Sequence, residues 1–141
     1  MSVLFTRSAR GAGLGLLVLR VVVGVVFIAH GSQKLFTYGL AGITGGFEQM
    51  GVPMASVTAP LVTFVELIGG VALILGFLTP IAAALLAIDM LGAILFVHGK
   101  NGLFLPNGYE FALTLLAVNV TLLLAGPGAA AVDNVLGNRR R

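Results

Sequence analysis

The chain has 141 residues, of which 58% are hydrophobic and only 9% are charged, and its mean hydropathy is +1.08. Soluble domains are roughly 45–50% apolar and about 25% charged, so this composition predicts helices that lie in lipid. The absence of cysteine excludes thiolate catalysis, disulfide exchange and cysteine-ligated metal or iron–sulfur centres. The net charge of +3 comes mainly from arginines near the two ends of the chain, which suits membrane topology better than nucleic-acid binding.

Four apolar segments have about the length needed to cross a bilayer, roughly 20 residues each. The pattern predicts spans over residues 11–36, 57–78, 81–97 and 108–125, within a single membrane domain that covers residues 1–141. A glycine-rich stretch over residues 37–53 is expected to lie on the bilayer surface instead. The expected fold class is therefore an all-α, integral membrane four-helix bundle.

Basic residues set the expected orientation of this bundle. Arg7, Arg10 and the arginines at 139–141 lie at one end of a four-span arrangement, against Lys34 and Lys100 at the other end. Lysine and arginine concentrate in short cytoplasmic loops. We therefore expect both termini to be cytoplasmic and the chain to be a multi-pass protein of the inner (plasma) membrane.

Three ionisable residues, Arg20, Glu66 and Asp89, fall well inside the predicted spans. A charged side chain at the bilayer centre costs roughly 2.5–3.5 kcal/mol or more, so each is expected to face a partner or a wet cavity. At about 1.5 Å of rise per residue, all three lie within about one helical turn of the midplane. Arg20 is therefore expected to bridge the two carboxylates.

One cation facing two acids leaves one negative charge, so one carboxyl is expected to hold a proton. The layer would then be a proton-exchanging site. The alternative interpretation is a structural pin that fixes helix order and binds nothing.

Helical phase adds a stripe of small residues to the first span. Arg20, Gly24, Phe27, Gly31 and Lys34 recur at the 3.6-residue period, which predicts a groove that leads outward from the arginine.

The outer end of the bundle is expected to carry a polar mouth formed by six residues: His30, Lys34, His98, Lys100, Tyr109 and Glu110. Lysines at helix ends are also common interfacial anchors, so that interpretation stays open. His98 is about 180° from Asp89 on the third span, and the two are not expected to share a pocket. No metal site is expected, because the histidines lack H-x-x-x-H or E-x-x-H spacing.

Several motifs along the chain together resemble those of the DoxX family of small membrane proteins, and they cover nearly its whole length. They are Leu19-Arg20, the string HGSQKLF at 30–36, Phe47 with Gly51-Val52-Pro53, the string ELIGGVALILG at 66–76, Asp89-Met90 with Ala93 and His98, Gly108-Tyr109-Glu110, and Gly126-Pro127-Gly128 with Asp133.

This resemblance implies a four-helix membrane subunit linked to sulfur or oxidative-stress redox chemistry. Members of the wider family are associated with thiosulfate:quinone oxidoreductases, and some with a superoxide dismutase and a sulfurtransferase in a membrane oxidoreductase complex. The implied partners are soluble or membrane redox proteins.

Two functions follow as hypotheses. The first is a redox-complex subunit, not catalytic alone, that anchors a partner and offers a quinone pocket lined by Arg20, Glu66 and Asp89, with His30 as proton donor. The second is a non-catalytic scaffold, assembly factor or small-solute module whose buried charges are structural. Gly11-x-x-x-Gly15 makes a homo-oligomer plausible under either hypothesis.

Overall fold

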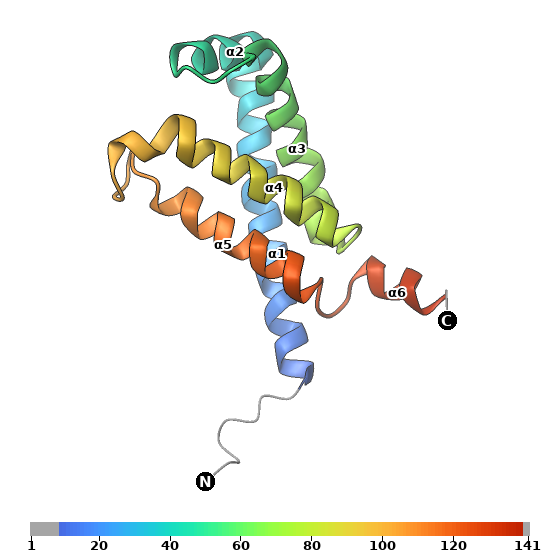
Figure 1. The fold of residues 1–141 in the computed structure, drawn as a ribbon. Helices are drawn as coiled ribbons and strands as arrows, with labels where there is room; N and C mark the ends of the chain where they lie inside the picture. Colours follow the sequence, from blue (N-terminus) through green and yellow to red (C-terminus); the bar gives the residue numbers. More distant parts are fainter. Residues whose placement is uncertain (1–8, 140–141) are drawn as a thin grey trace.

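The computed structural model describes residues 9–139, and every regular element in that range is helical (Figure 1). The α-helices are α1 (Ala9–Ser32), α2 (Gly39–Gln49), α3 (Ala55–Leu75), α4 (Thr79–Ala93), α5 (Glu110–Ala125) and α6 (Val132–Asn138). Two π-helical segments, η1 (Gln33–Tyr38) and η2 (Ile94–His98), continue α1 and α4, and the 3₁₀ turn η3 (Gly99–Asn101) follows η2. The predicted all-α class is confirmed for the described residues.

Helices α1 and α3 run antiparallel and in contact along much of their length (Figure 1). A Cβ atom on Gly24 would lie 2.7 Å from the carbonyl oxygen of Gly70, and a Cβ on Gly70 would lie 2.7 Å from that of Gly24. A Cβ on Gly31 would lie 2.8 Å from Cγ of Leu67. Small residues of this kind let membrane helices touch through their backbones.

The residues of the stripe predicted on the first span share one buried face, because Arg20, Gly24, Phe27 and Gly31 are all buried in α1. The predicted groove is not open, because α3 packs directly against Gly24 and Gly31. Lys34 continues the stripe into η1 and is half-buried. This face of α1 is therefore the face that meets the rest of the bundle.

Helix α4 packs against both α3 and α5. Four large apolar side chains of the shared core are at most 1% exposed: Phe27 of α1, Leu73 of α3, Leu86 of α4 and Leu122 of α5. In lipid, close packing of such side chains contributes through dispersion rather than through removal of water.

Three helical stretches are long and apolar enough to cross a membrane: Ala9–Gln49, Ala55–Leu75 and Thr79–Asn101. They contain the first three predicted spans over most of their length. Helix α5 is apolar but has 16 residues, or about 24 Å, against a hydrocarbon core of about 30 Å. The fourth crossing and the cytoplasmic termini remain predictions, and Arg7, Arg140 and Arg141, on which the orientation partly rests, lie outside the described residues.

The segment expected on the bilayer surface, residues 37–53, contains the helix α2. Gly39, at φ +74°, turns the chain between η1 and α2, and Gly51, at φ +76°, turns it again before α3. Figure 1 shows α2 folded across one end of the α1–α3 pair, opposite the end where α1 begins and α5 ends. Contact of α2 with the bilayer surface remains a prediction.

Candidate functional site: a lysine and two carboxyl groups inside the bundle

The predicted bridge from Arg20 to Glu66 and Asp89 is wrong. Every hydrogen bond of the guanidinium goes to a backbone carbonyl oxygen: Nε donates to Pro127 at 2.8 Å, Nη1 to Leu73 at 3.0 Å and Ile74 at 2.7 Å, and Nη2 to Ala129 at 2.6 Å and Ala130 at 2.9 Å. An arginine side chain has five N–H donors, so none is left for a carboxylate.

The cause of this error is the register between the helices. Arg20 lies beside the last turn of α3, where carbonyl groups lack partners within the helix and the helix dipole favours a cation. Glu66 precedes Leu73 by seven residues, or about 10 Å along the helix axis. The depth estimate placed Arg20 and Glu66 at one level, whereas Arg20 lies beside the last turn of α3 and Glu66 lies near the middle of that helix.

The segment after α5 and the first turn of α6 bind to the end of the bundle where α3 stops and α4 begins. Asp133 accepts the backbone N–H of Leu78 on Oδ1 at 2.7 Å and that of Thr79 on Oδ2 at 2.9 Å, and so caps α4. The N–H of Asp133 donates to the carbonyl of Gly76 at 2.9 Å. We call Arg20, Gly76, residues 127–130 and Asp133 the Arg20 clasp. Its contacts support the structural interpretation for this arginine.

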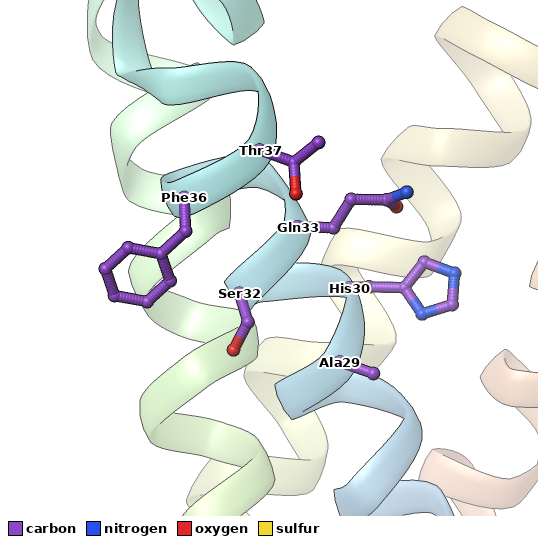
Figure 2. A pocket seen from close by; sticks show the side chains of 6 residues that line it. All are labelled: Ala29, His30, Ser32, Gln33, Phe36 and Thr37. Carbon is purple, nitrogen blue, oxygen red and sulfur yellow. The ribbon is translucent and has the colours of Figure 1, made fainter.

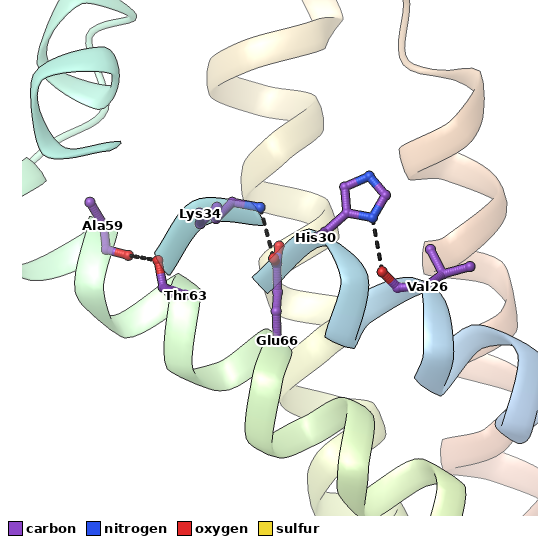
Figure 3. Close-up of polar contacts among 6 residues, drawn as sticks. All are labelled: Val26, His30, Lys34, Ala59, Thr63 and Glu66. Atoms are coloured by element: carbon purple, nitrogen blue, oxygen red, sulfur yellow. Dashed lines mark hydrogen bonds and ion pairs between the residues drawn. The ribbon is translucent and has the colours of Figure 1, made fainter. Parts of the chain in front are cut away.

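Lys34 occupies the position beside Glu66 that was predicted for Arg20. Its Nζ donates to Oε2 of Glu66 at 2.7 Å, and the two side chains are 19% and 4% exposed (Figure 3). This is the one ion pair within residues 9–139. It joins η1 to the middle of α3 at a depth where few water molecules can compete for the charges.

Asp89 of α4 adds a second acid to this ion pair. It lies within electrostatic range of both Glu66 and Lys34. Its Oδ2 atom is buried and has no hydrogen-bond partner in the part of the chain that the structure describes. We call Lys34, Glu66 and Asp89 the carboxyl–lysine cluster; it brings together one cation and two acids from three elements, and it can bind or release a proton.

His30 lies one helical turn before Lys34. Its Nδ1 donates to the carbonyl oxygen of Val26 at 2.9 Å, and its ring packs against Phe111 of α5 with the ring centroids 5.8 Å apart. A neutral ring with its proton on Nδ1 leaves Nε2 as a proton acceptor.

The outer face of α1 and η1 carries an open hollow of about 500 Å³ (Figure 2). The residues around it recur at helical spacing and are Ala29, His30, Ser32, Gln33, Phe36 and Thr37. His30 therefore borders the hollow, while its hydrogen bond and its ring contact are with Val26 and Phe111 and not with the carboxyl–lysine cluster.

His98 and Glu110 lie apart from the carboxyl–lysine cluster. Nδ1 of His98 donates to the carbonyl oxygen of Asn107 at 3.1 Å, and Oε1 of Glu110 accepts the N–H of Leu105 at 3.3 Å. Both side chains therefore hold the loop between η3 and α5. Within residues 9–139 there is no group of three side chains that could hold a metal ion.

Two buried polar residues and the capping role of Asp133 escaped the sequence analysis. Thr63 of α3 and Asn119 of α5 are fully buried and bond to carbonyls of their own helices, at 2.8 Å and 2.9 Å. An asparagine in an apolar run is unfavourable against lipid and so favours an inward position, and this signal could have found Asn119; a threonine, which can bond to its own helix, carries a weaker one. Asp133 did stand out as part of the closing motif, but only the fold brings it to the start of α4.

Comparison with known proteins finds one family and several relatives. The DoxX family model matches residues 15–99. A Haemophilus influenzae protein is 38% identical over 120 residues, which cover 82% of this chain and 86% of the relative. The "Putative oxidoreductase CatD" of Bacillus subtilis is 37% identical over 120 residues, or 85% of each chain. The "Inner membrane protein YqjF" of Escherichia coli is 36% identical over 132 residues, which cover 89% of this chain and 95% of the relative. No solved structure matches the chain.

Proposed function

Since the chain belongs to the DoxX family, we propose that it is an integral membrane subunit of an oxidoreductase complex, whose carboxyl–lysine cluster exchanges protons with a lipid-borne quinone. The protein is a multi-pass protein of the inner membrane, with lipid around its apolar helices. A relative named as an oxidoreductase supports the redox class. We propose that a soluble or membrane redox partner anchored by this subunit supplies the electrons.

The observation that carries the proposal is the unequal charge in the cluster. With both carboxyls ionised, Lys34, Glu66 and Asp89 together hold one net negative charge inside the bundle. An uncompensated charge in a low-dielectric interior is costly, and one proton on the carboxyl pair removes it. Asp89 lies within hydrogen-bond reach of Glu66, so the two carboxyls can share that proton.

The hollow on α1 and η1 suits the head group of a quinone. It lies on a helix long enough to span the membrane, so its open side is expected to face lipid. Ser32, Gln33 and Thr37 offer hydrogen-bond donors for quinone carbonyls, and Phe36 offers an aromatic face (Figure 2).

In the proposed quinone reduction, each residue has one role in proton transfer. A quinone takes up two electrons from the redox partner and two protons to become a quinol. In this proposal His30 passes protons from the carboxyl–lysine cluster to the hollow, and each proton is replaced from water at the membrane surface. After a proton leaves, the positive charge of Lys34 offsets one of the two negative charges on the carboxyls.

Quinone titration tests the proposal. A short-chain benzoquinone is titrated into the purified full-length protein in lipid nanodiscs, and binding is followed by calorimetry in two buffers of different ionisation enthalpy. We expect saturable binding by the wild type, weaker binding by Gln33→Leu, and altered proton uptake and affinity in Glu66→Gln. Glu48→Gln makes the same chemical change on the exposed surface of α2 and should behave as the wild type. Absence of binding, or unchanged binding and proton uptake in Glu66→Gln, would count against the mechanism.

A second candidate function, a non-catalytic scaffold or small-solute module, is favoured by the Arg20 clasp. The clasp joins α1, the end of α3 and the segment after α5 through backbone contacts, which is what an assembly platform needs. If Arg20→Met and Glu66→Gln both lose folding in detergent while the partner's activity persists in fresh membranes, the scaffold is the better account.

A further inference from the structure

The short helix α6 (Val132–Asn138) leaves the bundle sideways, beside the α3–α4 turn (Figure 1). Asp133 ties its first turn to Leu78 and Thr79, and Asn134 donates to the carbonyl of Gly128 at 2.7 Å. The direction of α6 is therefore set by the end of the bundle. Helix α6 therefore starts beside the turn where the apolar span of α3 ends and that of α4 begins.

One face of α6 is apolar and partly exposed. Val132, Val135 and Leu136 lie on that face and are 37%, 56% and 43% exposed. At 100° per residue, Asn134 and Asn138 lie on the opposite face. An apolar face of this kind does not suit water.

Positive charge lies at the C-terminal end of the apolar face. Arg139 follows the helix on the same side as Val135 and Leu136 by helical phase, and it is exposed. The sequence continues with two further arginines, at 140 and 141. Arginine next to an apolar stripe matches the interface of an anionic membrane, where the guanidinium meets lipid phosphate and the apolar side chains enter the acyl region.

We propose that α6 is an interfacial foot, which lies on the membrane surface and binds anionic phospholipid through Arg139. The clasp fixes the start of α6, so lipid binding at the foot is coupled to the position of α3, α4 and Arg20. A membrane is favoured over a soluble protein as the occupant because the apolar face and its basic C-terminal end occur together at the end of spanning helices. This inference does not depend on quinone binding.

The chain has no tryptophan, so a single introduced tryptophan reports on its own surroundings. Leu136→Trp places the reporter on the apolar face. Asn138→Trp places it about 160° away on the same helix and is the matched control. Each full-length variant is reconstituted in vesicles of phosphatidylcholine with or without phosphatidylglycerol. Fluorescence is recorded with brominated lipids and with iodide as a quencher in water.

We expect Leu136→Trp to emit at shorter wavelength, to be quenched by brominated lipid and to be protected from iodide, and Asn138→Trp to show the reverse. Replacing Arg139 with glutamine should reduce the lipid quenching of Leu136→Trp several-fold in the anionic vesicles and little in the neutral ones. Equal lipid quenching of the two reporters would overturn the proposal. So would a Leu136→Trp reporter that stays exposed to iodide in vesicles and is shielded only by a purified redox partner, because α6 would then be a protein docking site. Thermal unfolding of each variant confirms that the bundle is intact.

Discussion

Arg20 and Lys34 lie on one stripe of the same continuous helix, yet they serve different partners. Arg20 has a planar group with five donors and meets five carbonyl oxygens that converge from two parts of the chain. Lys34 carries a compact charge on a flexible stem and reaches one carboxylate oxygen. The shape of each cation therefore matches its partners, and exchanging the two residue types would satisfy neither site.

Replacing Arg20 tests its structural role. Arg20→Met leaves buried carbonyl groups without donors, and we expect it to lower the free energy of unfolding in detergent by at least about 3 kcal/mol. Arg20→Lys keeps the charge but has only three donors, so it should fall between the wild type and Arg20→Met. Stability is read from equilibrium unfolding in mixed micelles. Wild-type stability in Arg20→Met would contradict the role assigned to the clasp.

Lys34 and Glu66 form a pair that a double-mutant cycle can measure. Lys34→Met leaves two buried acids without a cation, and Glu66→Gln leaves the lysine facing an amide, so each single variant should be less stable than the wild type. The double variant removes both charges. We expect a coupling energy of roughly 0.5–3 kcal/mol from the same unfolding assay. Strictly additive effects would mean that the contact at 2.7 Å contributes nothing.

At the scale of elements, the contact between α1 and α3 depends on glycine. A Cβ on Gly24 would lie 2.7 Å from the carbonyl oxygen of Gly70, which is closer than a carbon and an oxygen atom can pack. Because both atoms belong to rigid helices, the pair can relieve the overlap only by moving apart. The same separation would draw η1 away from Glu66.

Gly24→Ala should therefore destabilise the protein by about 1–3 kcal/mol, the usual cost of overpacking. The control is Gly15→Ala in the same helix, where an added Cβ meets nothing within 4 Å. There, alanine should be neutral or stabilising by up to about 1 kcal/mol, because it favours the helix. Thermal unfolding of the two variants side by side decides the matter. Equal effects would mean that the close approach of α1 and α3 does not hold the pair.

Much of the architecture could be predicted from residue patterns. Apolar runs of bilayer length predicted the three long helices, and the 3.6-residue period predicted the buried face of α1. The residues that form the carboxyl–lysine cluster stood out as well, since charges are rare in such runs. Their pairing could not be predicted, because pairing depends on how far one helix slides along another. The backbone contact between Gly24 and Gly70 sets that register, and no local pattern encodes it.

The capping of α4 by Asp133 could not be predicted from the sequence either, because Asp133 lies 54 residues after Thr79. The π-helical form of η1 also leaves no mark on the apolar pattern.

At the scale of the whole molecule, the orientation in the membrane is open to direct measurement. The chain has no cysteine, so single cysteines can be introduced without background. With both termini in the cytoplasm, Asn101→Cys should react with a membrane-impermeant maleimide added to intact cells, and Asn138→Cys should react only after the membrane is opened. The opposite labelling pattern would reverse the orientation. Labelling of both cysteines from outside would contradict an even number of crossings.

The central claim is that Lys34, Glu66 and Asp89 share one exchangeable proton inside the bundle. Infrared spectroscopy of the protein in lipid at neutral pH tests it directly, because a protonated carboxyl has its own carbonyl stretching band. We predict such a band in the wild type and in Glu48→Gln, its loss or shift in Glu66→Gln and in Asp89→Asn, and a change when quinone is added. A wild-type spectrum without the band, or a band unaffected by both cluster variants, would contradict the claim.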